Sequence, residues 1–374
     1  MKKTLVAVAV AGAFVPALAS AQSSSVQLYG KITYEYAIRD QGPTFVKTDA
    51  TDVPGGSAIG FKGEEKLGGG LSAWFQCESS ADIRGQDSVA GNGFCTRNSA
   101  VGFKGGFGNL WFGKWDTPFK KVLNVGSVGA TETGSLGASF LAFGGSGGAD
   151  VTANGNNRAR WKRREMSMTN FESKMGNTTI MAGMSAGDNA LDAATGSRKQ
   201  RVTSFGLAQK LGAFDLAVGH EIHTDFGGVG LDDKATGFGV STNLGKAKIG
   251  FTYLDASYQT AAGQKTTRTS WTLGANAPLS GPWSVEGQYS VANDGKGNGA
   301  AIQNNSRQGF QVGANTGGSQ ISLGLIHAFS KRTDASLRYT KINNDANAHY
   351  ALGDATGTRG TNMKAYGVLV QHKF

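Results

Sequence analysis

Segments in which hydrophobic and polar residues alternate recur along this chain, and residues 363–374 show the pattern clearly. The apolar face of this last segment carries every second residue, namely Tyr366, Val368, Val370, His372 and Phe374. The opposite face is wetter, with Gly367, Gln371 and Lys373, and is interrupted only by Leu369. Successive side chains of a strand point to opposite faces, so the pattern predicts a strand between lipid and water. We interpret its aromatic end (Tyr366, His372 and Phe374) as a membrane-insertion signal.

Sixteen strand-like segments follow one another to the end of the chain, and short and long connections alternate between them. They are residues 26–38, 57–67, 71–79, 95–104, 110–115, 160–171, 178–186, 200–210, 213–223, 234–243, 247–258, 268–277, 283–293, 320–329, 335–343 and 363–374. Outer-membrane barrels combine short periplasmic turns with long outer loops. The pattern therefore predicts an all-β fold, a 16-stranded antiparallel transmembrane β-barrel. A soluble β-sandwich is the alternative, but such regular alternation over one region is not typical of it.

The first 21 residues have the features of a secretory signal. Lys2 and Lys3 are followed by the almost wholly apolar residues 4–18, and Ala19-Ser20-Ala21 supplies small residues for cleavage. The apolar run is shorter than the roughly 20 residues that span a bilayer as a helix. We therefore expect residues 1–21 to be removed on export to the periplasm, and residues 22–374 to form one barrel in the outer membrane.

Composition agrees with a barrel whose interior is wet. Hydrophobic residues make up 39% of the chain and the mean hydropathy is −0.26, which hydropathy alone would assign to a soluble protein. Half of each barrel strand faces the lumen, however, so low hydropathy is expected. The formal net charge is +10. For an exported chain with scattered basic residues, this excess favours attraction of anions and gives no reason to expect nucleic acid as a partner.

Cys77 and Cys95 are the only cysteines. An even pair in an oxidising compartment predicts one disulfide across the intervening loop, with two unpaired thiols as the alternative. No C-x-x-C zinc spacing occurs. His220 and His223 do not suggest a metal site, because strand positions three apart point to opposite faces.

Catalytic signatures are missing from the sequence. It contains no G-x-S-x-G nucleophile elbow and no G-x-x-x-x-G-K-[ST] phosphate loop. We expect no enzymatic activity, no cofactor and no metal. Aromatic residues near strand ends are typical of interfacial girdles, although Trp74 is a candidate for the lumen.

Several motifs resemble those of the general diffusion porins of Gram-negative bacteria, and specifically their beta-proteobacterial branch. The resemblance covers the whole mature chain. The motifs are IGFKGEEKLGGGL at residues 59–71, RNSAVGFKGGFGNL at 97–110 followed by Gly113-Lys114 and Thr117-Pro118, FSKRTD at 329–334, and the terminal His372-Lys373-Phe374.

This resemblance implies a homotrimer of 16-stranded barrels, each with its own aqueous pore. It also implies that one long loop, here residues 116–159, folds into the lumen and faces a wall of arginines. Arg97 matches one wall arginine, and either Arg163 or Arg164 matches another, the register being open. Lys114 stands where the family usually has arginine, and Ala58 replaces a further one.

The charges around this loop predict a positive constriction. The loop contains only three acidic residues, Asp116, Glu132 and Asp150. The expected lining is Arg97, Lys114, Arg160, Arg163 and Arg164, together with Glu132 and Asp150. Basic side chains in a narrow passage favour anions, so we expect an anion-preferring channel for small anionic or neutral solutes. An outer-loop patch that binds lipopolysaccharide phosphates is the alternative for residues 158–164.

Two other functional classes remain open. A substrate-selective outer-membrane channel would carry a specific site for an anion or sugar in its lumen, and an aromatic ladder would favour it. A plugged barrel acting as an enzyme or adhesin would not conduct ions. The predicted lumen loop favours a pore over a plugged barrel.

Overall fold

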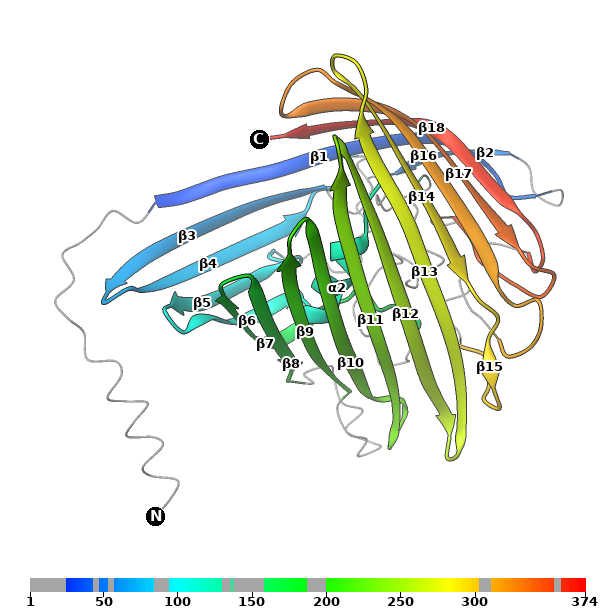
Figure 1. The fold of residues 1–374 in the computed structure, drawn as a ribbon, viewed down its shortest axis with the longest axis horizontal. Coiled ribbons are helices and arrows are strands. Elements are labelled where there is room, and N and C mark those ends of the chain that lie inside the picture. The colour runs from blue at the N-terminus through cyan, green and yellow to red at the C-terminus, as the bar shows by residue number, and fades with distance from the viewer. Residues whose placement is uncertain are drawn as a thin grey trace.

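A computed structural model describes residues 25–42, 47–52, 57–83, 94–129, 136, 158–186, 200–302, 311–352 and 358–374. These residues form a closed antiparallel β-barrel of sixteen strands (Figure 1). The barrel strands are β1 (Ser25–Asp40), β3 (Ala58–Gly68), β4 (Leu71–Ser80), β5 (Ser99–Gly105), β6 (Gly108–Asp116), β7 (Arg164–Met175), β8 (Thr178–Ser185), β9 (Arg201–Leu211), β10 (Phe214–Gly228), β11 (Leu231–Leu244), β12 (Ala247–Ala261), β13 (Gln264–Pro278), β14 (Trp283–Ala292), β16 (Gly318–Ala328), β17 (Thr333–Asn344) and β18 (Met363–Lys373). Two short strands, β2 (Thr48–Asp52) and β15 (Lys296–Gly297), pair with β1 and β13 in the connections.

Closure of the barrel depends on the pairing of its first and last strands. Each barrel strand pairs with the next along the chain, and β18 pairs back to β1 from Lys31↔Lys373 to Asp40↔Lys364. Beyond that ladder, Gly30 and Phe374 exchange two backbone hydrogen bonds of 3.1 Å. Closure leaves no unpaired strand edge in lipid. The predicted all-β barrel of sixteen strands is confirmed.

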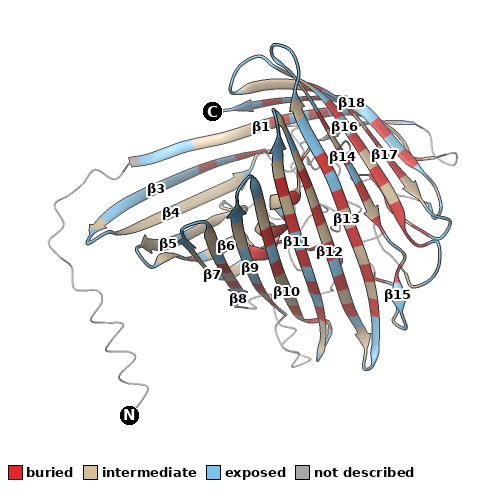
Figure 2. Ribbon diagram, in the orientation of Figure 1, coloured by how far each residue is buried: buried red, intermediate tan, exposed pale blue. Residues whose placement is uncertain are grey.

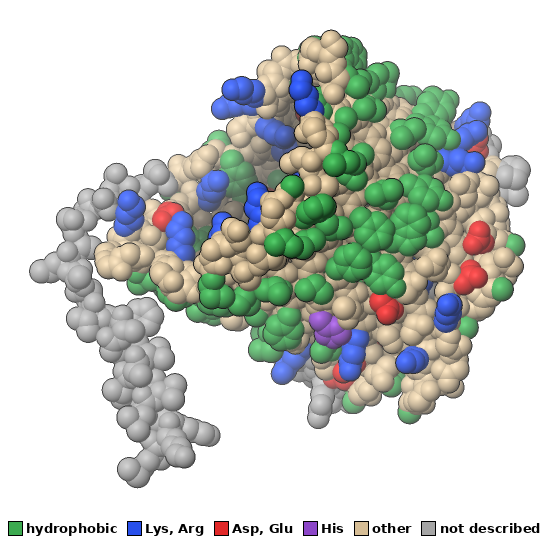
Figure 3. All heavy atoms as spheres, viewed as in Figure 1, with side chains coloured by type: hydrophobic (Ala, Val, Ile, Leu, Met, Phe, Trp, Pro, Cys, Tyr) green, Lys and Arg blue, Asp and Glu red, His purple; other side chains and the backbone are tan. Residues whose placement is uncertain are grey.

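The two faces of the barrel differ in chemistry. On β13, Leu273 points outwards and is 48% exposed, whereas inward-facing Thr266, Ser270 and Thr272 are fully buried. Figure 2 shows this alternation of exposed and buried residues along the strands. Hydrophobic side chains form a belt across the outside of the barrel, and charged side chains gather towards its two ends (Figure 3). The belt matches the outward-facing apolar band of a membrane barrel.

Two strands begin four residues later than the sequence pattern predicts. β5 begins at Ser99, after a turn in which Cys95 adopts a left-handed conformation (φ 63°). β7 begins at Arg164, so Arg160 and Arg163 precede the strand. Within the described ranges, no helix is long and apolar enough to cross a membrane. Residues 1–21 lie outside these ranges, so the signal sequence stays a prediction.

Candidate functional site

A helix follows β6 and lies against the inner face of β9–β12 (Figure 1). Helix α2 (Pro118–Gly126) begins after Thr117, whose side chain accepts a hydrogen bond from the Lys120 N–H at 3.3 Å. Thr117-Pro118 is a typical helix start, since threonine caps the free N–H groups and proline needs no N–H in the first turn. Phe119 and Leu123 are fully buried against the wall. The sequence analysis did not predict this helix, although Thr117-Pro118 is recognisable in the sequence as a helix start.

Glycines on the barrel wall let α2 approach closely. A Cβ at Gly239 would lie 2.7 Å from the Gly126 nitrogen, and one at Gly250 would lie 2.4 Å from the Gly126 oxygen. Real Cβ atoms do not tolerate such contacts, so these two positions require glycine. The many glycines of this chain thus have a second use beyond turns, which is to make room for the helix.

Two described parts of the connection between β6 and β7 form hydrogen bonds with the inner face of the barrel wall. Near α2, the Leu123 carbonyl accepts a hydrogen bond from Thr252 Oγ1 on β12 at 3.1 Å. Further along, the Leu136 N–H donates to Glu35 Oε1 on β1 at 3.2 Å. Both Thr252 and Glu35 are buried on the inner face. The described parts of this connection therefore contact the inner wall at two separate strands, β12 and β1.

Four cations gather beside the first turn of α2, and we refer to Lys120, Arg160, Lys162 and Arg164 as the basic cluster. Asp116 is the carboxylate within it: Lys120 Nζ lies 2.7 Å and Arg164 Nε 3.2 Å from Asp116 Oδ1. Burial and the charges of Arg164 and Arg160 lower the pKa of Lys120, although Asp116 opposes the shift. The cluster carries more positive than negative charge, and its side chains remain partly exposed.

Lys162 lies between β6 and β7, outside the strands. Its Nζ donates to Ser127 Oγ at 2.6 Å. Burial, and after it the charge of Lys120, lower the pKa of Lys162 to about 7. Lys162 therefore changes charge near neutral pH, unlike an ordinary lysine.

Arg97 lies just before β5. Its Nε contacts Glu78 Oε1 at 2.6 Å, and the Tyr29 hydroxyl donates to Glu78 Oε2 at 3.1 Å. The predicted Cys77–Cys95 disulfide is confirmed. It joins the neighbour of Glu78 to the turn that carries Arg97, so it holds the two partners of this ion pair in place.

Removing the disulfide is expected to destabilise this part of the wall. In Cys77→Ser/Cys95→Ser, the lost cross-link over 18 residues is expected to cost about 3 kcal/mol in the free energy of unfolding. Thermal unfolding in detergent, followed by circular dichroism, measures the loss. Reduction of the wild-type protein serves as the matched control, and an unfolding temperature unchanged in both cases would contradict the prediction.

Arg163 is placed differently from its neighbour Arg164. Its side chain is 2% exposed and its Nε contacts Glu165 Oε1 at 2.5 Å. The adjacent Trp161 is fully buried, stacks on His223 with 4.1 Å between ring centroids, and donates to the Tyr258 hydroxyl at 2.7 Å. Arg163 and Trp161 thus belong to a buried group, here called the packed anchor, which joins the segment before β7 to the barrel wall. The charge of Arg163 is therefore not exposed to the pore. Of the two matches left open, Arg164 is the one in the basic cluster.

Lys114, another predicted lining residue, is not brought to the basic cluster. Lys114 pairs with Ser99, on the same side of the ladder as outward-pointing Val101 and Phe112. Glu132 and Asp150 lie outside the described residues.

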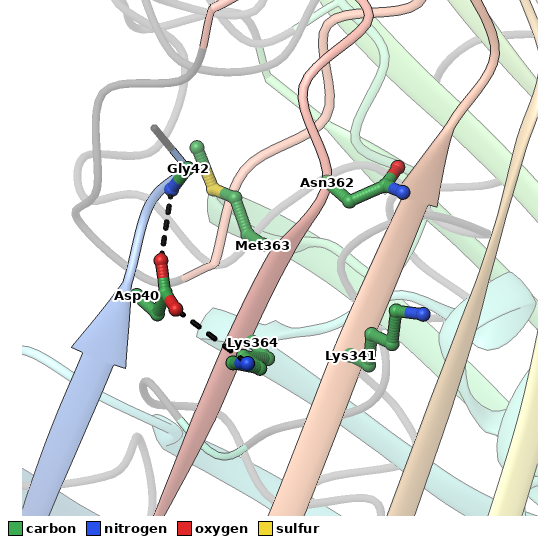
Figure 4. A pocket seen from close by; sticks show the side chains of 6 residues that line it. All are labelled: Asp40, Gly42, Lys341, Asn362, Met363 and Lys364. Carbon is green, nitrogen blue, oxygen red and sulfur yellow. Dashed lines mark hydrogen bonds and ion pairs between the residues drawn. The ribbon is translucent and has the colours of Figure 1, made fainter. Parts of the chain in front are cut away.

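A separate pocket lies at the loop end of β1, β17 and β18 (Figure 4). Lys341 and Lys364 line it, and Lys364 Nζ lies 3.6 Å from Asp40 Oδ2. Lys364 shares the outward face of β18 with Tyr366 and is 48% exposed in its side chain. These charges are outside the barrel and serve below as a control for those within.

Comparison with known proteins establishes the family. The family model for "Gram-negative porin" matches residues 6–347. The chain belongs to the Gram-negative porin family. This porin is 28% identical over 353 residues to the outer membrane porin protein 32 of Delftia acidovorans, covering 89% of this chain and 87% of that protein. It is also 41% identical over 131 residues to the major outer membrane protein P.IB of Neisseria meningitidis.

The match to the Neisseria protein covers 33% of this porin and 37% of the relative's length. Among solved structures, the anion-selective porin from Comamonas acidovorans superposes with a TM-score of 0.72 at 22% identity, over 94% of this chain and 100% of that one. That likeness supports the fold. The family, the outer belt and the closed barrel identify this porin as an outer-membrane protein.

Proposed function

We propose that this porin is a water-filled channel for passive diffusion of ions and small hydrophilic solutes, and that it prefers anions. The observation that carries the proposal is the basic cluster beside α2, inside a closed barrel. Clefts lined by one sign of charge raise the local concentration of counterions. The anion selectivity named for the Comamonas porin supports the same preference.

Bilayer recording of the purified protein tests the proposal. Across a salt gradient, the reversal potential is expected to show anion preference at about 0.1 M salt, and the preference is expected to shrink towards about 1 M, where the Debye length falls to about 3 Å. A cation-selective reversal potential at low salt would contradict the preference. The absence of any conductance would contradict the channel.

The anion preference is expected to depend on pH through Lys162. A lysine is charged below its pKa, and that of Lys162 is about 7. Acidification from about pH 8 to about pH 6 should therefore add a positive charge to the basic cluster and strengthen the preference. Reversal potentials across this range measure the change. Lys162→Met should abolish this pH-dependent change in the reversal potential. The control Lys174→Met changes a lysine that is exposed at the short-turn end of β7 and should retain the change. If the change persists in Lys162→Met, another group is responsible for it.

We further propose that this porin assembles as a homotrimer in contact with membrane lipids and lipopolysaccharide. Family membership supports the trimer, and the apolar belt supports the lipid contact. Lys341 and Lys364 offer ammonium groups at the loop end for lipopolysaccharide phosphates. A monomeric mass in mild detergent would contradict the assembly.

A further inference from the structure

Three tryptophans cluster on the inner wall formed by β4, β5 and β6. Trp74 and Trp111 both pair with Gly102 in the strand register. Their neighbours Phe75 and Phe112 point outwards and are 41% and 43% exposed. Side chains alternate along a strand, so the two indoles face the interior. They are therefore not part of the interfacial girdle, which faces lipid.

The cluster is compact and fixed in position. Trp115 completes it, with ring centroids 5.7 Å from Trp74 and 5.9 Å from Trp111, and Trp74 lies 6.2 Å from Trp111. The ring planes meet at 53°, 67° and 69°. A Cβ at Gly102 would lie 2.6 Å from Trp111 Cβ and 2.9 Å from Trp74 Cε2, so glycine there lets the indoles meet. Trp74 Nε1 donates a hydrogen bond to Asn109 Oδ1 at 2.8 Å, and this bond fixes the orientation of the Trp74 ring.

Core packing does not account for the whole cluster. Trp74 is partly exposed and lines a pocket of about 390 Å³ at the short-turn end, together with Gln27, Lys62, Glu64, Gln76 and Lys104. Trp111 is only 3% exposed, and its Nε1 has no hydrogen-bond acceptor within the described chain. Trp111 is not among the residues that line the pocket, so Trp74 is the indole that a solute there contacts.

The polar side chains around the indoles favour an anion. Lys104 Nζ is paired with Glu64 at 2.5 Å, and Lys121 Nζ is paired with Glu172 at 2.6 Å while lying 5.0 Å from the Trp111 ring centroid. Lys62 makes no ion pair with a described residue; its Nζ lies 5.1 Å from the Tyr29 ring centroid. The pocket thus offers an aromatic face and one ammonium group not neutralised by a carboxylate.

We propose that this pocket is a saturable subsite for small aromatic carboxylates, a proposal that rests on the channel function above. The solute's ring contacts Trp74, and its carboxylate binds the Lys62 ammonium. Rings prefer tilted and offset contacts over face-to-face stacking, and Trp74, the indole that lines the pocket, provides such a contact for one ring. The three indoles form one compact cluster and not a row of parallel aromatic faces, so the pocket is less suited to an oligosaccharide. A solute that passes the basic cluster meets this subsite before it leaves by the short-turn end.

Benzoate titrations in bilayers test the subsite. Added on the short-turn side, benzoate is expected to reduce the KCl current saturably, with half-saturation on the order of millimolar, since a channel site must also release its solute. Acetate and cyclohexanecarboxylate, which carry the same charge without an aromatic ring, should not produce this saturation. Equal saturation by all three, or saturation by a neutral oligosaccharide in place of benzoate, would overturn the proposal.

Two variants and one control locate the effect. Trp74→Leu is expected to raise the half-saturating benzoate concentration about tenfold, and Lys62→Gln should raise it without changing the tryptophan cluster. Trp283→Leu, at an exposed position outside the barrel, should leave it unchanged. Quenching of tryptophan fluorescence by benzoate gives a second readout, expected to be reduced in Trp74→Leu.

The outcomes separate the two proposals. KCl conductance without saturable benzoate block would overturn the subsite alone, whereas a folded protein without KCl conductance would overturn the channel. If Trp74→Leu does not fold, Lys62→Gln decides: an unchanged benzoate titration in that variant rejects the subsite.

Discussion

Neutralising two cations of the basic cluster is expected to remove most of the anion preference. In Lys120→Gln/Arg160→Gln, Arg164 remains to pair with Asp116, so that carboxylate keeps a cation beside it. Counterion enrichment by a charged cleft is about tenfold or more at low salt, and the ratio of anion to cation permeability should fall by at least about threefold. Reversal potentials at about 0.1 M salt measure the ratio.

A matched control removes the same charge from the outer surface. Lys341→Gln/Lys364→Gln changes two lysines of the loop-end pocket (Figure 4), which lie on the outer face of the barrel. Its permeability ratio should match the wild type, because exposed charges are screened over about 10 Å at this salt. Equal effects of the two double variants would show that net charge, rather than the basic cluster, sets the selectivity.

The barrel was predictable because its strands repeat one simple pattern. Inward and outward positions alternate from β1 to β18, and the terminal segment shows its apolar face in Tyr366, Val368 and Val370. Sixteen repeats of this signal outweigh errors at single strand ends. The disulfide was predictable for a similar reason: only two cysteines exist, and export supplies an oxidising compartment.

The interior was harder to predict because non-local contacts decide it. Arg163 and Arg164 are adjacent in sequence, yet one is buried against Glu165 and the other contacts Asp116. Which one is buried depends on where β7 begins, and on the packing of the preceding Trp161 against His223, which is distant in sequence. No local pattern encodes this contact. Lys114 was assigned to the lining from resemblance alone, and only the register with Ser99 shows which way it faces.

The contact between Trp74 and Trp111 on the inner wall was also hard to predict from the sequence. Trp74 was a candidate for the lumen, whereas Trp111 is one of the aromatic residues near strand ends, a position typical of interfacial girdles. Gly102 between them is the informative residue, since an interior glycine in a strand often marks a close approach. Only the pairing of three strands shows that the approach is between two indoles.

Breaking the buried ion pair of Arg163 is expected to destabilise the protein without changing selectivity. Arg163→Met removes the guanidinium that lies 2.5 Å from Glu165 Oε1, while the Glu165 side chain stays 4% exposed in the native packing. Removal of one partner of a buried ion pair typically costs about 3–5 kcal/mol, because the remaining charge is uncompensated. Thermal unfolding in detergent should shift downwards, while the reversal potential of the folded fraction stays at the wild-type value.

The second partner provides the control. Arg163→Met/Glu165→Met removes both charges and should recover at least half of the lost stability, since apolar replacement of a whole buried pair is often neutral. Arg160→Met, in the partly exposed basic cluster, should change selectivity with little effect on unfolding. The opposite pattern, in which Arg163→Met alters the reversal potential and leaves the unfolding temperature unchanged, would place Arg163 in the passage and reject the packed anchor.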